Sequence, residues 1–340
     1  MTIETKKQPL LISGRELKNM SMTMQPQDWI VEGLLRTGRR RMSLLAGKPE
    51  SGKSTLALQL AVSVCKGEPF LGRSTVRSEV LYWNTEEDVS DVWDSLQHLG
   101  YDPDRDMALW LPTGSTDVNP VQSLRNALAE HPDVRLVILE TVDDVLRIDD
   151  IKENTAARQA FTTFDAAIME KFSQQVTFLG LHHLKKRETD STGDMLLGAT
   201  WLRGRTDAKL YLKQISDSDD RRVFHATVRK GRSVAPTILN FDKHTGKSTL
   251  GITVVEERKR GAVERHERIL QSILEYFHKN PGKAFETDCL PCLECNSDEA
   301  RRIHKRAVVD GLLSKSGKGT RGNPFVYRVA GIPDEERKVA

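Results

Sequence analysis

The sequence predicts an α/β protein with a mostly parallel sheet, followed by a small domain of helices and a hairpin. A glycine-rich octapeptide at residues 47–54 lies between an apolar segment and a helical pattern. Strand-like and helix-like segments alternate from residue 29 to about 255, and a different pattern of helices and a hairpin follows. The expected parts are an arm at 1–28, a first domain at 29–255, a charged linker at 256–262, a second domain at 263–330 and a tail at 331–340.

The octapeptide matches the P-loop pattern G-x-x-x-x-G-K-S/T in full. Backbone N–H groups must wrap around a polyphosphate, so Gly47 and Gly52 are expected in conformations that side chains forbid. Lys53 is expected to reach the β and γ phosphates, and the Ser54 hydroxyl to bind Mg²⁺. The helix that follows points its positive end at the phosphates. ATP and Mg²⁺ are therefore the expected ligands, held by Gly47, Lys48, Pro49, Glu50, Ser51, Gly52, Lys53, Ser54 and Thr55.

Short apolar runs and helical spacing predict the other elements of the first domain. The expected strands are Met42–Ala46, Val80–Asn84, Ala108–Leu111, Leu136–Glu140, Val176–Leu181, Ala208–Leu212, Val223–Val228 and Thr237–Phe241, and the expected helices are 53–66, 90–99, 119–130 and 154–173. The last three strands are closely spaced and are expected to be antiparallel. A second Gly-Lys-Ser sequence at 246–248 has Phe241 where the motif needs its first glycine, so it predicts a hairpin turn at Thr245-Gly246.

An acid at the end of an apolar strand is the usual partner of a P-loop, because it holds the metal. Leu136–Glu140 is such a strand, and it makes Glu140 the expected Mg²⁺ ligand, although Asp is more common at this position. Asp143 and Asp144 follow closely and could share the role.

Three further segments stand in a recognisable order around the P-loop. Trp29–Leu35 leads into it, an apolar strand at 80–88 ends in acids that include Glu86, and Leu179–Lys186 is a strand end that carries His182 and His183. These segments resemble those of RecA-like ATPases, in particular the branch of RepA-type hexameric helicases and their DnaB and KaiC relatives. The resemblance implies that Glu86 is the catalytic glutamate and that His183 senses the γ-phosphate, with His182 as the alternative.

Val228–Ser233 resembles the hairpin tip whose cations reach the ATP of a neighbouring subunit in these helicases. The resemblance implies a ring-shaped homo-oligomer, a hexamer. In this ring, Lys230 and Arg232 of one subunit would act on the ATP of the neighbouring subunit. Leu197–Ala208 resembles the family motif that comes before this hairpin in the chain, but it carries Arg203 and Arg205 in place of small residues. Which of Arg203, Arg205 and Arg232 is the arginine finger therefore stays open.

The second domain is expected to hold three helices and a hairpin. The segment 264–278 is amphipathic, a short helix is expected near 286–294, and a third helix over 299–313 precedes a hairpin with a polar loop at 317–323. This order of elements resembles a winged helix-turn-helix. The third helix would be the recognition helix and the hairpin the wing. A winged helix used for protein contacts is the alternative. The expected DNA-binding residues are Arg301, Arg302, Lys305, Arg306, Lys318 and Arg321.

The composition excludes several classes of protein. The chain is 38% hydrophobic with a net charge of +3, and it has no apolar run of membrane-spanning length. Residues 1–8 are mostly polar and the apolar run at 10–12 is short, so no signal peptide is expected. A cytoplasmic protein without membrane partners is expected. Of four cysteines, Cys289, Cys292 and Cys295 form a cluster. We interpret them as one face of a helix in the core rather than as metal ligands, since structural zinc prefers four.

Together, these features predict an ATP-hydrolysing motor on DNA, a replicative helicase or translocase of a plasmid or phage-type element. The alternative is a DNA-binding regulator that ATP switches and that does not unwind DNA. Both hypotheses use every motif above.

Overall fold

The computed structural model describes residues 13–23, 29–37, 41–84, 88–112, 119–147, 154–184, 206–216 and 221–331. The chain divides into two compact units, Met1–Thr253 and Val254–Ala340. Each unit has its own hydrophobic core and is described separately. No helix in the described ranges combines the length and the hydropathy needed to cross a membrane.

The first unit is built on a nine-stranded sheet in the order β11-β10-β9-β8-β3-β7-β6-β4-β5. The strands from β8 to β5 in this order pair in parallel, and β8, β9, β10 and β11 pair antiparallel. Their bounds are Ser43–Gly47 (β3), Glu79–Asn84 (β4), Leu109–Trp110 (β5), Val134–Glu140 (β6), Thr177–His183 (β7), Ala208–Gln214 (β8), Arg222–Val228 (β9), Val234–Phe241 (β10) and Ser248–Thr253 (β11). The expected strands and the antiparallel group are confirmed, and Gly246, with a φ of 65°, lies in the expected turn.

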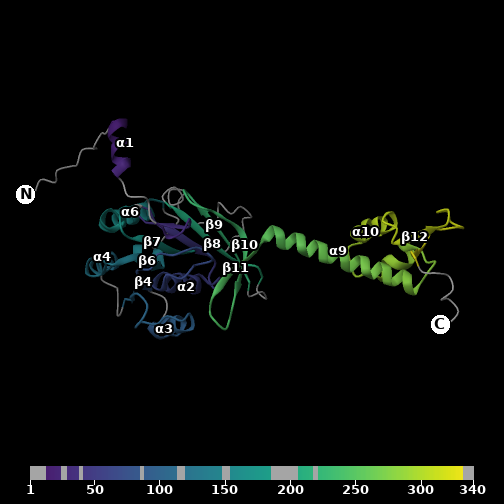
Figure 1. Ribbon diagram of the computed structural model, residues 1–340, viewed down its shortest axis with the longest axis horizontal. Coiled ribbons are helices and arrows are strands. Elements are labelled where there is room, and N and C mark those ends of the chain that lie inside the picture. The colour runs from purple at the N-terminus through teal and green to yellow at the C-terminus, as the bar shows by residue number, and fades with distance from the viewer. Residues whose placement is uncertain are drawn as a thin grey trace, which may run out of the picture. The chain divides into compact units, whose positions relative to one another are not determined.

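Helices cover both faces of this sheet (Figure 1). On one face α2 (Lys53–Lys66) and α3 (Val89–His98) pack on alternate side chains of the strands. On the other face lie α4 (Pro120–Glu130), α5 (Val142–Leu146), α6 (Asn154–Phe164), the π-helical turn η1 (Asp165–Met169) and α7 (Glu170–Phe172). The central strands are buried on both sides and therefore read as continuous apolar runs in the sequence.

Part of the expected arm is a helix, α1 (Gly14–Thr23). The backbone N–H and the hydroxyl of Ser13 both donate to the Glu16 carboxylate, and the Ser13 hydroxyl in turn accepts from the Glu16 N–H. This reciprocal capping box starts a helix in a segment that has few apolar residues. A separate hairpin of β1 (Trp29–Val31) and β2 (Leu35–Arg36) follows.

The second unit begins with a long helix, α9 (Val254–Lys279). Residues 256–262 were expected to form a linker. They instead form the first turns of this helix, so the expectation of a linker is wrong. Arg260 pairs with Glu257 and Glu264 at helical spacing, and no proline interrupts the segment. The rest of the unit is η2 (Phe285–Cys289), η3 (Leu290–Cys292), α10 (Ser297–Val309), β12 (Leu313–Ser316) and β13 (Val326–Val329).

The order of elements in the second unit matches the expected helix, short helix, helix and hairpin. The short helix is a π-helical turn followed by a 3-10 turn, with Pro291 at the start of the second. Because of this break, the three cysteines do not share one face: Cys289 is fully buried, Cys295 is half-buried and Cys292 is exposed. The core interpretation is therefore correct for Cys289 and wrong for Cys292. The helix α10 ends at Val309, earlier than expected, before the positive φ of Gly311.

Candidate functional site

The parallel strands bring the candidate residues of the first unit to one edge of the sheet. Gly47 at the end of β3 lies beside His183 at the end of β7, and the Leu184 N–H donates to the Gly47 carbonyl at 3.1 Å. Glu140 at the end of β6 lies beside Asn84 at the end of β4. Because β7 and β6 are neighbours, four strand ends meet where ligands of α/β sheets bind.

The P-loop uses its two glycines for different reasons. Gly52 has a φ of 88° and caps the N-terminus of α2, as expected. Gly47 has no positive φ, but a Cβ there would lie 2.4 Å from Ser51 Oγ and 2.7 Å from the Leu212 carbonyl oxygen. Close packing, rather than backbone conformation, therefore excludes a side chain at residue 47. Glu50 also has a positive φ, of 62°, although it is not a glycine.

The Lys53 side chain is held at the centre of this loop. Its Nζ donates to the Lys48 carbonyl at 2.9 Å and lies 3.3 Å from His183 Nδ1. Lys53 is only 6% exposed, so its charge stays inside the loop. The structure thus brings His183 to the P-loop lysine, and its role as a phosphate sensor stays a prediction.

The candidate metal ligands meet below the loop. The Ser54 hydroxyl donates to Glu140 Oε1, and the Tyr82 hydroxyl donates to Glu140 Oε2. Glu140 and Tyr82 are both buried. Tyr82 comes from β4 and was not expected from the sequence, because an apolar strand gives no sign of where a phenol points.

The alternatives to Glu140 and His183 have other roles. His182 is buried, and its Nδ1 lies 3.3 Å from Asp143 Oδ2. Asp144 accepts a hydrogen bond from the hydroxyl of Thr141, the N-cap residue of α5, at 2.5 Å. The Ser54 hydroxyl contacts Glu140, and Lys53 contacts His183. Glu140 and His183 are therefore the residues of this set that the fold brings to the P-loop.

The hairpin tip with Lys230 and Arg232 lies at the other edge of the sheet. In the β8–β9 pair, Arg222 lies beside Gln214 and Val228 beside Ala208, so β9 runs away from the P-loop edge. β8 has seven residues, which at about 3.3 Å per residue separates the two edges by roughly 20 Å. Both cations are exposed. Arg222 at the near end of β9 instead donates to the Ser51 carbonyl at 3.2 Å, a contact that the sequence did not indicate.

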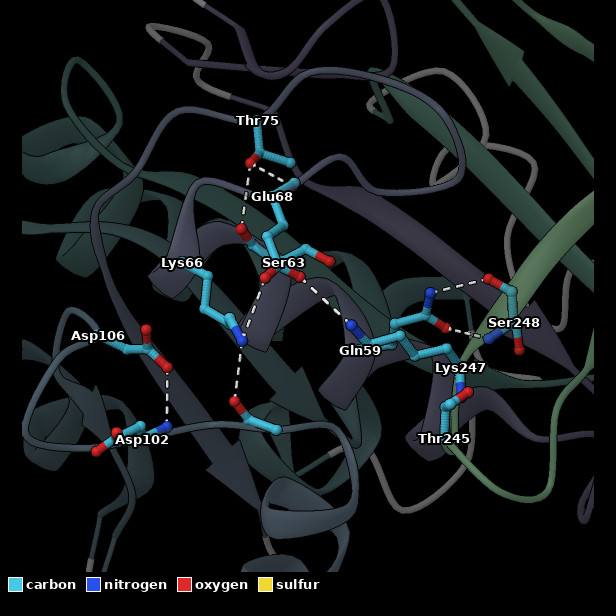
Figure 2. Close-up of polar contacts among 11 residues, drawn as sticks. Gln59, Ser63, Lys66, Glu68, Thr75, Asp102, Asp106, Thr245, Lys247 and Ser248 are labelled. Atoms are coloured by element: carbon cyan, nitrogen blue, oxygen red, sulfur yellow. Dashed lines mark hydrogen bonds and ion pairs between the residues drawn. The ribbon is translucent and has the colours of Figure 1, made fainter.

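The helix α2 is fixed to its surroundings by polar contacts that are buried or partly buried (Figure 2). Gln59 donates to the Ser248 carbonyl at 2.9 Å and accepts from the Ser248 N–H at 2.7 Å. At the C-terminal end of the helix, the Thr75 hydroxyl contacts the carbonyls of Ser63 and Glu68 at 3.2 and 2.7 Å. The helix that starts at the P-loop therefore connects β11 with the loop before β4.

Three candidates of the first unit lie outside the described residues. They are the expected catalytic residue Glu86 and the alternative fingers Arg203 and Arg205.

The candidate DNA-binding cations of the second unit fall into three groups. Arg301 donates to Glu286 and Asp298, which holds its pKa above the ordinary value, and Arg306 donates to Asp310 at 2.9 Å. Arg302 and Lys305 on the same helix are exposed and have no side-chain partner among the described residues. Lys318 and Arg321 are exposed in the loop between β12 and β13.

The geometry fits the ligands that the motif implies. The loop around Gly47 has no room for a side chain, and the buried Ser51 Oγ has no hydrogen-bond partner among the described residues. A hydroxyl and a carboxylate, from Ser54 and Glu140, are the oxygen donors that Mg²⁺ prefers. Lys53 and the N-terminus of α2 supply positive potential for phosphates. The parallel sheet and this site define a P-loop ATPase core of the AAA/RecA-like kind.

A comparison with family models agrees with this class. The model described as AAA domain matches residues 14–189, just over half of the chain, and the protein belongs to this family. The match indicates ATPase activity, and members of the family generally bind ATP with Mg²⁺. No curated protein matches the chain.

Proposed function

We propose that this protein is an ATP-driven motor on DNA that works as a ring, as RepA-type hexameric helicases of plasmids and phages do. The observation that carries the proposal is the separation of the P-loop from the cationic hairpin tip. Residues that lie at opposite edges of one sheet cannot serve the same nucleotide within one chain. A head-to-tail ring solves this problem, because each tip then meets the P-loop of the next copy.

The residues at the P-loop edge divide the chemistry between them. Lys53 and the α2 N-terminus hold the β and γ phosphates, and Ser54 and Glu140 hold Mg²⁺. Bound Mg²⁺ neutralises charge on the phosphate oxygens. His183, whose Nδ1 lies 3.3 Å from Lys53 Nζ, senses the γ-phosphate. Glu86 is assigned the general base that orients the attacking water, and Lys230 and Arg232 of the neighbouring copy stabilise the transition-state charge.

The second unit is assigned the contact with duplex DNA as a winged helix. Its helix α10 presents Arg302 and Lys305 to solvent, and the β12–β13 loop presents Lys318 and Arg321. Cations on a recognition helix and on a wing contact phosphates on both sides of a groove. This placement supports DNA, rather than a protein, as the ligand of the unit.

Strand displacement on a forked duplex tests the proposal. We expect unwinding that requires ATP and Mg²⁺, and an ATPase rate that rises when single-stranded DNA is added. The Lys53→Ala protein is the matched control and should not unwind. ATP-dependent duplex binding without unwinding and without stimulation would instead favour the regulator, and the motor proposal would then be wrong.

A further inference from the structure

Three segments far apart in the sequence meet at the hairpin tip. They are the turn at 32–34, the loop at 70–75 and the tip itself at 229–233. Arg73 joins them: its Nη1 donates to the Glu32 carbonyl at 3.0 Å, and its Nη2 donates to the Arg232 carbonyl at 3.0 Å. The Arg232 N–H donates to the Gly33 carbonyl at 2.8 Å. The backbone of Arg232 is therefore fixed on both of its polar groups.

Close packing removes the remaining freedom of the tip. A Cβ at Gly231 would lie 2.6 Å from the Gly33 carbonyl oxygen and 2.7 Å from the Trp29 ring. The Ser233 hydroxyl accepts from the Val228 N–H at 3.0 Å and closes the turn from within. An exposed hairpin tip is usually mobile, whereas this one is anchored on both sides.

Arg73 holds the tip and does not itself reach outward. Both terminal nitrogens of its guanidinium are used by carbonyls of its own chain. Burial, and then the nearby Arg232, lower the pKa of Arg73. Arg232 is exposed, and its side chain has no partner among the described residues. Repulsion between the two guanidinium groups favours an Arg232 side chain that points away from Arg73, toward solvent or an anion.

The loop that carries Arg73 is also connected to the chain's own nucleotide site. Phe70 and Arg73 exchange backbone hydrogen bonds of 2.9 and 3.0 Å, which closes the loop. Thr75 ties the same loop to the carbonyls of Ser63 and Glu68, at the end of α2 opposite the P-loop (Figure 2). A continuous set of contacts thus joins the P-loop helix to the tip.

We propose that Arg73 is a positioning residue for the trans-acting tip: it clamps the backbone of Arg232 so that Lys230 and Arg232 are presented to the triphosphate of a neighbouring copy. This inference rests on the proposed function, because it assumes that the tip acts on a neighbour. It assigns Arg73 to the subunit that donates the finger and not to the subunit that binds the nucleotide.

Mixing of inactive variants of the full-length protein separates these two roles. Lys53→Ala removes the nucleotide side of an interface, and Arg232→Ala removes the finger side. In a randomly mixed ring, about a quarter of the interfaces combine an intact P-loop with an intact finger. We expect ATPase activity to recover toward that fraction for Lys53→Ala with Arg232→Ala, and equally for Lys53→Ala with Arg73→Ala. Arg73→Ala with Arg232→Ala should not recover, because both changes affect the finger side.

Two further variants keep the test specific. Arg73→Lys retains the charge but lacks the fork that reaches two carbonyls, so it should behave like Arg73→Ala. Arg77→Ala is the matched control: this arginine of the same region donates to the carbonyls of Cys65 and Arg105 and not to the tip. It should keep its activity without a partner. Binding of a fluorescent ATP analogue should be unchanged in Arg73→Ala, since its own P-loop is intact.

Each outcome decides between the two proposals. If the reference pair of Lys53→Ala and Arg232→Ala fails to recover in verified mixed rings, action in trans is wrong and the role of Arg73 is wrong with it. If the reference pair recovers activity, but Arg73→Ala and Arg73→Lys do not recover it when each is mixed with Lys53→Ala, only the role of Arg73 is overturned. Full activity of both Arg73 variants without a partner would overturn it as well.

Discussion

Tyr82 and Ser54 donate hydrogen bonds to opposite oxygens of the buried Glu140 carboxylate. Glutamate has one more rotatable bond than the aspartate that is more common at this position, so its carboxylate needs more support. The Tyr82 phenol on the neighbouring strand β4 supplies this support. These two contacts hold the glutamate carboxylate in place at the predicted metal site.

The first prediction follows from this contact. Tyr82→Phe keeps the ring and removes only the hydroxyl, so the fold should persist while Glu140 becomes less ordered. A hydrogen bond to a charged group contributes about 1.5–3 kcal/mol. We therefore expect the Mg²⁺ concentration for half-maximal ATP binding to rise roughly tenfold or more. A Mg²⁺ titration of fluorescent ATP binding measures this directly.

A double mutant provides the control for Tyr82. Aspartate at residue 140 is too short to reach the phenol, so adding Tyr82→Phe to Glu140→Asp should change the Mg²⁺ requirement little. Strict additivity of the two changes would mean that the hydroxyl does not act through Glu140.

The second prediction concerns Lys53 and His183, which lie 3.3 Å apart at the P-loop. Lys53→Ala should abolish hydrolysis and weaken ATP binding, because it removes the cation that faces the phosphates. His183→Ala should bind ATP with nearly normal affinity and hydrolyse it slowly, since a sensor acts after binding. Calorimetric binding and single-turnover rates separate the two effects. Near-normal turnover of Lys53→Ala would exclude the P-loop as the catalytic site.

The sequence predicted most of the first unit, for identifiable reasons. The strands β3, β6 and β7 are buried on both faces, so they appear as uninterrupted apolar runs between clear helices. The P-loop is a local motif whose residues are contiguous. His183 and Glu140 could be placed near it because parallel strands end at one edge of a sheet.

The contacts missed by the sequence analysis depend on tertiary structure or on local capping. Tyr82 acts on a carboxylate from another strand, and Arg73 contacts carbonyls about 40 and 160 positions away in the chain. Neither relationship leaves a local pattern. The helix α1 has a local signal, the Ser13–Glu16 capping box, but the polar composition of the arm concealed it. The same holds for the charged start of α9, whose ion pairs favour a helix over a linker.

The third prediction compares two pairs of cations on α10 that carry the same total charge. Arg302 and Lys305 have no side-chain partner among the described residues, whereas Arg301 and Arg306 are paired with acids of the same unit. Replacing Arg302 and Lys305 with alanine should weaken DNA binding more than replacing Arg301 and Arg306. Each lost phosphate contact should reduce the salt dependence, log K against log salt, by about 0.9. Equal effects of the two pairs would show that only net charge matters and that α10 is not a recognition helix.

The last prediction concerns the buried His304 of the second unit. Its ring stacks on the Phe285 ring, with 3.8 Å between the ring centroids, and lies edge-to-face with the Tyr327 ring, with 4.3 Å between centroids. Burial lowers the pKa of His304 to about 4 from the ordinary 6.5. The folded unit therefore holds a neutral imidazole in the range where the unfolded chain takes up a proton. Unfolding free energy should fall as the pH drops from about 6.5 toward 4, by roughly 1–3 kcal/mol from this residue, and then level off.

Chemical denaturation of residues 254–340 at several pH values measures this effect. His304→Phe keeps an aromatic ring in the stack and removes the titrating group, so the difference between the two proteins isolates His304. That difference should change between pH 6.5 and 4 and be constant above pH 7.5. The nearby Glu286 raises the pKa of His304 and Lys315 lowers it, but both remain in the variant and cancel in the comparison. Parallel stability profiles across this range would mean that His304 is protonated as easily in the folded unit as in the unfolded chain.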